Sequence, residues 1–279
     1  MVFIGQIRED PMRIEQIDTS SRKNVIHSIW MIRMEKEKLQ EGYYFFPDNH
    51  AEIIVSLKGS FRRSIVGGRK TTEVLPGESI LTRTRNRGMV LSGNDDIRLL
   101  IIKLQPQYLG LFSCESAYRF KEEIQPFSLP SEYKWDWKHA IVNNQPVELV
   151  EIFERYSEEL QLQGKKQIDS LIDETIMLIK HNKGEIKIKE LYELFGVCKS
   201  TLEQKFNKEI GLSPKEFCKI EKLNHFLKNY EEFKSEMSLT QLTFKSGYYD
   251  QSHLIKDFKY YVDDSPKRFL TKANLVSLH

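Results

Sequence analysis

Two segments in the C-terminal half of the chain form an internal repeat. Residues 188–217 read IKELYELFGVCKSTLEQKFNKEIGLSPKEF, and residues 239–269 read LTQLTFKSGYYDQSHLIKDFKYYVDDSPKRF. Each segment contains a short apolar stripe, a glycine, a second apolar stripe and a Ser-Pro pair. This order predicts two helices joined by a tight turn and followed by a stop. Two copies are too few to cap a solenoid, so we expect two helix-turn-helix units, at 188–208 and 239–259.

The local chemistry of each segment agrees with this prediction. Gly196 and Gly247 stand where the turn between the helices needs a positive φ. Ser238 and Asp250 are expected N-caps, because their side-chain oxygens can accept from unpaired backbone N–H groups. Each second helix has an apolar pair at positions i and i+4 that faces the core. These pairs are Leu202 with Phe206 and Leu254 with Phe258.

The opposite faces of the two second helices carry mostly small or hydrogen-bonding side chains, as a helix in a major groove requires. In the first unit these are Ser200, Glu203, Gln204 and Asn207, and in the second they are Ser252, Ile255, Lys256 and Lys259. A solvated helix face is the alternative interpretation, and for single lysines such as Lys199 and Lys205 the two interpretations are about equal.

The string SGYYDQSHLIKDFKYYVDDSPKRF resembles the second helix-turn-helix signature of the AraC/XylS family of bacterial transcription regulators, and the first segment is similar to that family's first motif. The likeness covers roughly residues 168–270. It implies binding to specific sequences of double-stranded DNA, with two recognition helices in successive major grooves and a joining helix from Pro214 to about Tyr230. RNA polymerase is a further partner that the resemblance implies. Tyr192 and Thr243 depart from the family pattern, which commonly has alanine at both positions.

The positions that align with the family motifs are the candidates for DNA contacts. Base-edge candidates are Ser200, Glu203, Gln204, Gln251, Ser252 and Lys256. Phosphate candidates, which position a protein without reading sequence, are Lys199, Lys205, His253 and Lys259.

The first half of the chain has a different period. Short apolar runs between Asn24 and Pro106 alternate with turn residues such as Gly67-Gly68 and Pro76-Gly77, which predicts an antiparallel barrel or sandwich. Residues 146–163 have helical spacing, and Gly164-Lys165-Lys166 ends that helix. We therefore expect an α+β protein with a cupin-like domain of β-strands and helices at 1–164, for effector binding or dimerisation, and an all-α domain at 165–279.

Composition and charge favour a cytoplasmic location. The first residues lack a signal peptide, and no apolar run approaches the ~20 residues of a membrane span. Three cysteines at wide spacings form neither a disulfide framework nor a zinc cluster, which favours a reducing cytoplasm.

The net charge of +2 is too small to indicate nucleic-acid binding by itself. We expect no cofactor and no metal.

Two further features bear on the first domain. Arg83, Arg85 and Arg87 alternate, so in a strand they would share one face and could hold an anionic effector. A solvent-exposed or interdomain strand face is the alternative interpretation. The apolar stripe of residues 146–163 fits packing on its own barrel or pairing in a homodimer. No catalytic motif is present, so we expect no enzyme. The alternatives are a cupin-type metalloenzyme and a ligand-binding module with a degenerate helical domain.

Overall fold

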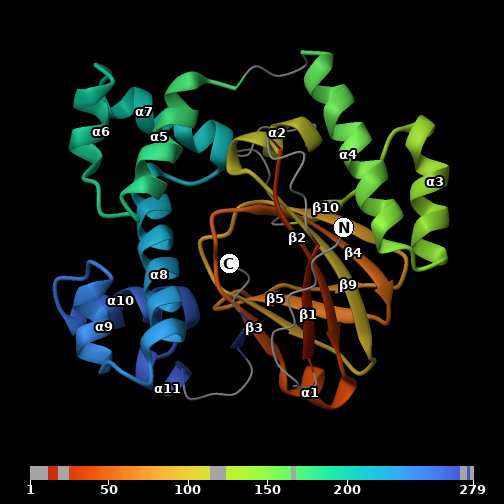
Figure 1. Ribbon diagram of the computed structural model, residues 1–279, viewed down its shortest axis with the longest axis horizontal. Helices are drawn as coiled ribbons and strands as arrows, with labels where there is room; N and C mark the ends of the chain where they lie inside the picture. Colours follow the sequence, from red (N-terminus) through yellow and green to blue (C-terminus); the bar gives the residue numbers. More distant parts are fainter. Residues whose placement is uncertain (1–11, 18–24, 114–123, 165–167, 271–274, 277–279) are drawn as a thin grey trace.

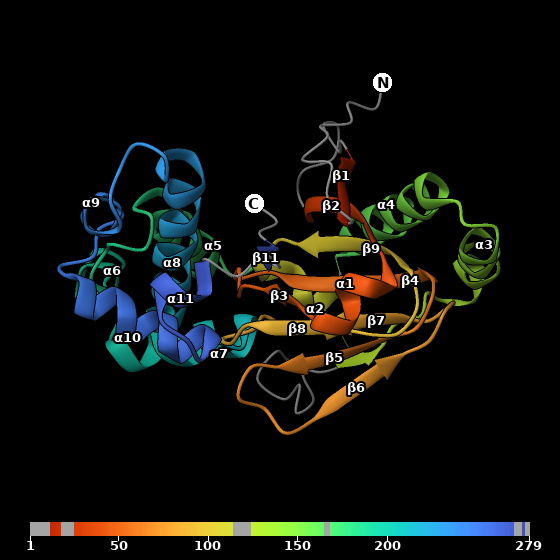
Figure 2. The ribbon, with the colours of Figure 1, turned by 90° about the horizontal axis from the view of Figure 1, so that it is seen from below.

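Figure 1 shows the computed structural model of the protein, which describes residues 12–17, 25–113, 124–164, 168–270 and 275–276. A β-rich domain and an all-helical domain lie side by side, and both views of the ribbon separate them (Figures 1 and 2). The predicted fold class is confirmed in its architecture: a β sandwich, antiparallel in its described pairings except for β11 with β3, precedes a helical domain with helix-turn-helix units. Within the described residues, no helix is long and apolar enough to cross a membrane.

The β-rich domain consists of two sheets. The first has the order β1-β2-β9-β4-β7-β10, and all its pairings are antiparallel. Its strands are β1 (Met12–Ile17), β2 (Ile26–Met34), β4 (Ala51–Lys58), β7 (Ser79–Thr82), β9 (Ile97–Leu104) and β10 (Ile124–Pro126). The second has the order β11-β3-β8-β5-β6. Its strands are β3 (Tyr43–Phe45), β5 (Phe61–Ile65), β6 (Thr71–Val74), β8 (Met89–Ser92) and β11 (Leu275–Val276).

The first sheet is buried on both faces, which explains its nearly continuous apolar strands. In β9, Leu99 and Ile101 face the interior between the two sheets. Leu100 and Ile102 face the opposite side, where they pack against helices. Those helices are α3 (Ser131–Val142) and α4 (Pro146–Leu162), on the outer face of the sheet in Figure 1. Shorter helices, α1 (Lys36–Glu41), η1 (Pro106–Tyr108) and α2 (Leu109–Phe112), connect the strands.

The predicted strands differ from the structure in number and in several boundaries. The apolar run from Ala51 to Phe61 is not one strand, because β4 ends at Lys58 and Gly59, with φ 73°, turns the chain into β5. The strands β1, β3, β6, β10 and β11 were not predicted from the sequence. The short strands among them lie at or next to sheet edges, so they carry little apolar pattern of their own.

The helical domain is organised around α8 (Pro214–Phe233), the predicted joining helix. The first unit consists of α6 (Ile188–Leu194) and α7 (Lys199–Ile210), and the second of α9 (Leu239–Lys245) and α10 (Gln251–Val262). Helices α5 (Ser170–His181) and α11 (Pro266–Leu270) complete the domain. The core pairs expected from the sequence, Leu202 with Phe206 and Leu254 with Phe258, are buried in one cluster.

The predicted caps of the second unit and the predicted turns of both units are confirmed. Ser238 accepts from the N–H of Gln241 in a capping box, and Asp250 accepts from the N–H of His253. Gly196 and Gly247 have φ of 61° and 75°. The positive φ favours glycine at position 247, whereas the nearest atom to a Cβ there, the carboxyl carbon of Glu185 at 2.2 Å, belongs to the end of an exposed side chain that can move.

The two domains are joined by contacts from distant parts of the chain. Phe46, which follows β3, lies in the core cluster of the helical domain. Strand β11, from the end of the chain, pairs in parallel with β3. Of the predicted linker, Lys165 and Lys166 lie outside the described residues, and the boundary between residues 164 and 165 stays a prediction.

Candidate nucleic-acid interface

The first turns of α7 and α10 open onto one hollow of about 500 Å³. Helix α7 contributes Lys199 and Glu203, and α10 contributes His253 and Asp257. Helix α8 contributes three lysines one helical turn apart: Lys215, Lys219 and Lys222. The N-terminal turns of both predicted recognition helices therefore lie on the same side of the domain, separated by a basic stretch of α8.

Most base-edge candidates are exposed on α7 and α10, and one of the six, Glu203, also lines the hollow. Ser200, Gln204, Ser252 and Lys256 are exposed, and Glu203 is half-buried. The exposed amide of Gln251 donates from Nε2 to Oγ1 of Thr240 at 2.5 Å, which ties the start of α10 to the start of α9. All six side chains therefore stay candidates for contacts with base edges, because none of them is buried.

The phosphate candidates differ in how far they are already engaged. Lys205 forms an ion pair of 2.7 Å with Asp169, the N-cap of α5, so its ammonium is directed to the side of α7 away from the hollow. Lys199 lies 3.7 Å from Glu203 one turn along. The ring of His253 stands edge-on to Tyr248, with centroids 5.4 Å apart. Lys259 is exposed and has no ion pair among the described residues.

Sequence reasoning missed the contribution of α8. Lys215, Lys219 and Lys222 follow the spacing i, i+4, i+7, which places them on one helix face. Lys219 donates to the buried carboxylate of Asp257 at 2.9 Å, and Lys222 donates to the carbonyl of Gly247 at 3.1 Å. These two lysines hold the second unit against α8, whereas Lys215 is exposed and has no ion pair in the described structure. The spacing was visible in the sequence, but only the fold shows that it faces the hollow.

The N-cap of α7 is Cys198, next to the base-edge candidate Ser200. Its Sγ lies 3.1 Å from Oγ of Ser200 and 3.0 Å from Oγ1 of Thr201. Hydrogen bonds from the Ser200 and Thr201 side chains lower the pKa of the exposed Cys198 thiol to about 7. By contrast, burial raises the pKa of the Cys218 thiol in α8 to about 12.

Cys198 is therefore expected to react with iodoacetamide at a rate that rises with pH and is half-maximal near pH 7, because the thiolate is the nucleophile. Cys218 serves as the internal control and is expected to stay unlabelled over the same range. Pulse labelling at pH 5.5 to 9, read for each cysteine by peptide mass spectrometry, measures both. A midpoint at the ordinary thiol value near 9 would show that the cap hydrogen bonds do not hold the thiolate.

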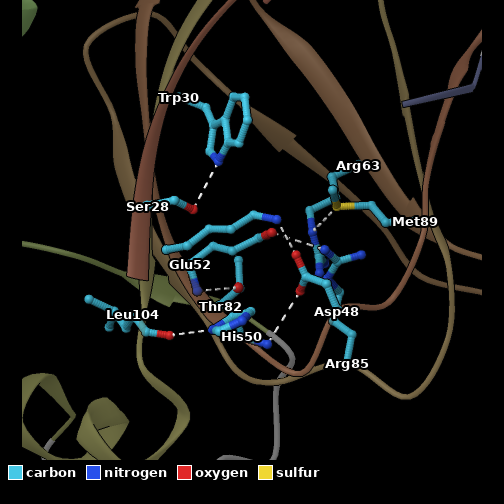
Figure 3. A network of polar contacts seen from close by, with 11 residues as sticks. Ser28, Trp30, Asp48, His50, Glu52, Arg63, Thr82, Arg85, Met89 and Leu104 are labelled. Atoms are coloured by element: carbon cyan, nitrogen blue, oxygen red, sulfur yellow. Dashed lines mark hydrogen bonds and ion pairs between the residues drawn. The ribbon is translucent and has the colours of Figure 1, made fainter. Parts of the chain in front are cut away.

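The interior of the β-rich domain holds a network of buried charges (Figure 3). Glu52 and Arg85 form an ion pair of 3.1 Å, and both side chains are 2% exposed. Asp48 is paired with Lys103. The Lys103 ammonium and the nearby His50 and Arg85 outweigh the effect of burial and lower the pKa of Asp48. No group of three or more His, Cys, Asp or Glu side chains that could hold a metal occurs among the described residues.

The expectation that Arg83, Arg85 and Arg87 share one strand face is wrong, because β7 ends at Thr82 and the three residues follow it in irregular chain. Arg85 turns inward to Glu52. The Arg87 guanidinium instead lies 4.2 Å from the ring centre of Tyr260 in α10. That the three arginines hold an effector stays a prediction, but the shared strand face on which it was based is not present.

The segment from Phe46 to His50 connects this network to the helical domain. The Asn49 amide donates from Nδ2 to the carbonyl of Phe217 and to Oε1 of Glu221, both at 2.9 Å. Both acceptors belong to α8. Asn49 has φ 61°, a backbone conformation that asparagine tolerates better than most residues. Asp48 of the charge cluster is thus the direct sequence neighbour of Asn49, which contacts the joining helix α8.

His50 makes the stability of the β-rich domain depend on pH. Its ring stacks on His27 at 3.9 Å and donates from Nδ1 to the carbonyl of Leu104 at 2.8 Å. Burial, with the neighbouring His27, lowers the pKa of His50 well below 6.5. The unfolded chain therefore binds more protons than the folded chain below pH 6.5, so stability falls as the pH decreases through that value.

Between pH 7.5 and 5.5 we expect the wild-type domain to lose about 1 kcal/mol more stability than His50→Gln. Urea unfolding followed by tryptophan fluorescence measures this, since Trp30, Trp135 and Trp137 all lie in the β-rich domain. His139→Gln, at an exposed position, is the control and is expected to behave as wild type. Equal pH dependence in all three proteins would contradict a neutral buried His50.

The comparisons with known proteins agree with this geometry. A sequence profile of the family described as a helix-turn-helix domain matches residues 191–272, which include both recognition helices and α8. The helical domain is therefore a DNA-binding helix-turn-helix domain, in agreement with the resemblance of residues 188–269 to the AraC/XylS motifs. No curated protein sequence matches the chain.

The chain is similar in fold to solved structures of ToxT from Vibrio cholerae. A structure at 1.65 Å resolution matches with 13% identity and a TM-score of 0.51, covering 94% of this chain and 98% of ToxT. ToxT bound to an unsaturated fatty acid matches with 13% identity and a TM-score of 0.50, covering 90% and 97%. ToxT bound to a methylnaphthalenyl butenoic acid matches with 13% identity and a TM-score of 0.51, covering 94% and 98%. At this identity the likeness concerns the fold.

Proposed function

We propose that this protein is a sequence-specific DNA-binding transcription regulator of the AraC/XylS type. It places α7 and α10 in successive major grooves of one DNA duplex, on the face of the helical domain where both helices begin. The observation that carries the proposal is the shared hollow, which the first turns of both helices border and α8 closes. Lysines around this hollow suit a phosphate backbone that passes between two grooves. RNA polymerase, which the family resemblance implies, is the proposed partner of the DNA-bound regulator.

Selection of bound fragments from random duplexes with the full chain tests this function. We expect a bipartite sequence whose two parts are separated by about one helical turn, because two helices on one side of a domain meet the same face of DNA. Affinity for the selected duplex is expected to fall steeply with salt. A single contiguous half-site, or retention that is independent of sequence and salt, would contradict the twin-groove arrangement.

Lys215 is the sharpest test of the basic surface between the recognition helices. Lys215→Ala is expected to weaken binding to every duplex alike and to lower the salt slope by about 1, as the loss of one phosphate contact does. Fluorescence anisotropy over a salt series measures this. Lys228→Ala is the matched control on the same helix, because Lys228 is exposed but does not line the hollow. An unchanged slope in Lys215→Ala would exclude the phosphate contact.

We further propose that a small-molecule effector bound by the β-rich domain modulates DNA binding. The solved structures of ToxT with an unsaturated fatty acid and with a naphthalenyl butenoic acid support this, since the fold is shared over most of the chain. Asn49 supports it further, because its hydrogen bonds to α8 offer a route from the sandwich to the recognition units.

The homodimer expected from residues 146–163 keeps the status of a prediction. The apolar stripe of α4 packs on the first sheet of its own domain, in agreement with the alternative interpretation of that helix. Sedimentation of the full chain across a concentration series is the direct measurement.

A further inference from the structure

A second cavity, of about 420 Å³, lies at the end of the β-rich domain remote from the helical domain. Strands β7 and β10 form one wall, β6 and the turn before β7 form another, and α3 covers the third side. In the order of each sheet, β10 and β6 are edge strands, so the cavity lies where the two sheets separate. Its volume is within the range of sites for small molecules.

The floor of this cavity is apolar and well fixed. It is formed by buried side chains from strands β7 and β10, the segment after β10 and helix α3: Ile80, Ile124, Phe127, Leu129, Trp137 and Ile141. The indole of Trp137 donates from Nε1 to Oγ of Ser79 at 3.1 Å and stands edge-on to Phe127, with centroids 6.1 Å apart. These contacts hold the two aromatic rings in place, so the floor is formed before any ligand arrives.

The rim of the cavity is cationic on the side of α3. Lys134 and Lys138 lie one turn apart on that helix, line the cavity and are exposed. Neither forms an ion pair within the described part of the chain. On the opposite side, Glu78 is engaged through Oε2 with the backbone N–H of Leu75 at 2.8 Å. Lys70, Lys134 and Lys138 line the cavity together with Glu73 and Glu78, so the formal charge of the lining is +1 (three lysines minus two glutamates). The two lysines of α3 make that side of the rim positive.

We propose that this cavity binds a small amphipathic anion. Its compact apolar body lies on Trp137 and Phe127, and its single carboxylate or sulfonate meets the ammonium groups of Lys134 and Lys138. The apolar floor supplies the affinity for the body, and the lysine pair selects the charge. Binding of this anion would supply the small-molecule effector of the proposed function, and any effect on DNA binding rests on that function. Binding of the anion to the cavity does not itself depend on DNA.

The experiment uses two fluorescent probes that share one apolar skeleton: 8-anilino-1-naphthalenesulfonate, an anion, and N-phenyl-1-naphthylamine, which is neutral. Each is titrated into the full chain. Thr72→Trp, on edge strand β6 at the cavity wall, places an indole in the space and is expected to abolish saturable binding of both probes. Unchanged titrations in Thr72→Trp would place the probes elsewhere and overturn the proposal.

The charge arm uses the double variant Lys134→Met/Lys138→Met. We expect it to weaken binding of the sulfonate roughly three- to tenfold and to leave the neutral probe unchanged, as the loss of two solvent-exposed charge contacts predicts. Lys36→Met/Lys58→Met removes the same net charge at exposed positions outside the cavity and is expected to match wild type. Equal changes for both probes, or none for either, would overturn the anion assignment.

DNA binding of the same variants, measured without probe, separates this inference from the proposed function. All of them are expected to bind the selected duplex as wild type does, because the cavity lies at the opposite end of the molecule from α7 and α10. A wild-type chain that bound the probes as expected but no duplex would overturn the groove assignment and leave the cavity assignment standing.

Discussion

Arg85→Met is expected to destabilise the β-rich domain by about 3–5 kcal/mol, because it leaves the buried carboxylate of Glu52 without its partner. The two side chains form an ion pair of 3.1 Å inside the sandwich and are each 2% exposed. Oε2 of Glu52 is already buried without a hydrogen bond, so Arg85 supplies the principal compensation for that charge. Urea unfolding followed by tryptophan fluorescence measures the loss.

The double variant Glu52→Leu/Arg85→Met is the control for this result. It removes both charges from the interior and is expected to recover most of the stability lost in Arg85→Met. The single variant Glu52→Leu completes the comparison. If the double variant loses as much stability as Arg85→Met and Glu52→Leu together, the ion pair is not what stabilises this region. Packing volume around the two side chains would then be the cause.

Lys256→Ala is expected to change which base the protein prefers at one position of its binding sequence. Lys256 is exposed on α10, on the face opposite the buried Leu254 and Phe258. A contact from a lysine to a guanine edge discriminates by about 1–3 kcal/mol, which corresponds to roughly 5- to 150-fold in relative affinity. Repeating the selection of bound fragments with the variant measures the change in preference.

Lys259→Ala is the matched control, since it removes the same charge from the same exposed face one turn further along α10. We expect it to weaken all duplexes alike and to lower the salt slope by about 1 without altering the selected sequence. Identical losses for the two variants on every duplex would refute the division between base contact and phosphate contact.

The helix-turn-helix units could be predicted from sequence because their signals are local. The apolar pair Leu254 and Phe258, the cap at Asp250 and the turn at Gly247 all lie within twelve residues and depend on helix geometry alone. The long strands β2, β4 and β9 were found for the same reason, as runs of apolar residues between turn signals. Short edge strands such as β6 and β10 carry no comparable pattern.

The functional surfaces could be predicted only in part. The base-edge candidates were placed by their spacing on α7 and α10, and the structure leaves most of them exposed. Lys215 was missed, because nothing in its neighbourhood along the chain shows that α8 passes beneath both recognition helices. The alternation of Arg83, Arg85 and Arg87 predicted a shared strand face and was wrong, since β7 ends before the first of them.

The amino-acid sequence by itself determined that this protein has two recognition helices on a helical domain after a β-rich one. Periodicity, caps and turns act over one or two helical turns, so they are written in consecutive residues. Only the tertiary structure decided that Phe46 enters the helical core, that Asn49 reaches α8, and that the edges of two sheets leave a cavity beneath α3. Those features join residues tens to hundreds of positions apart, and such contacts leave no period along the chain.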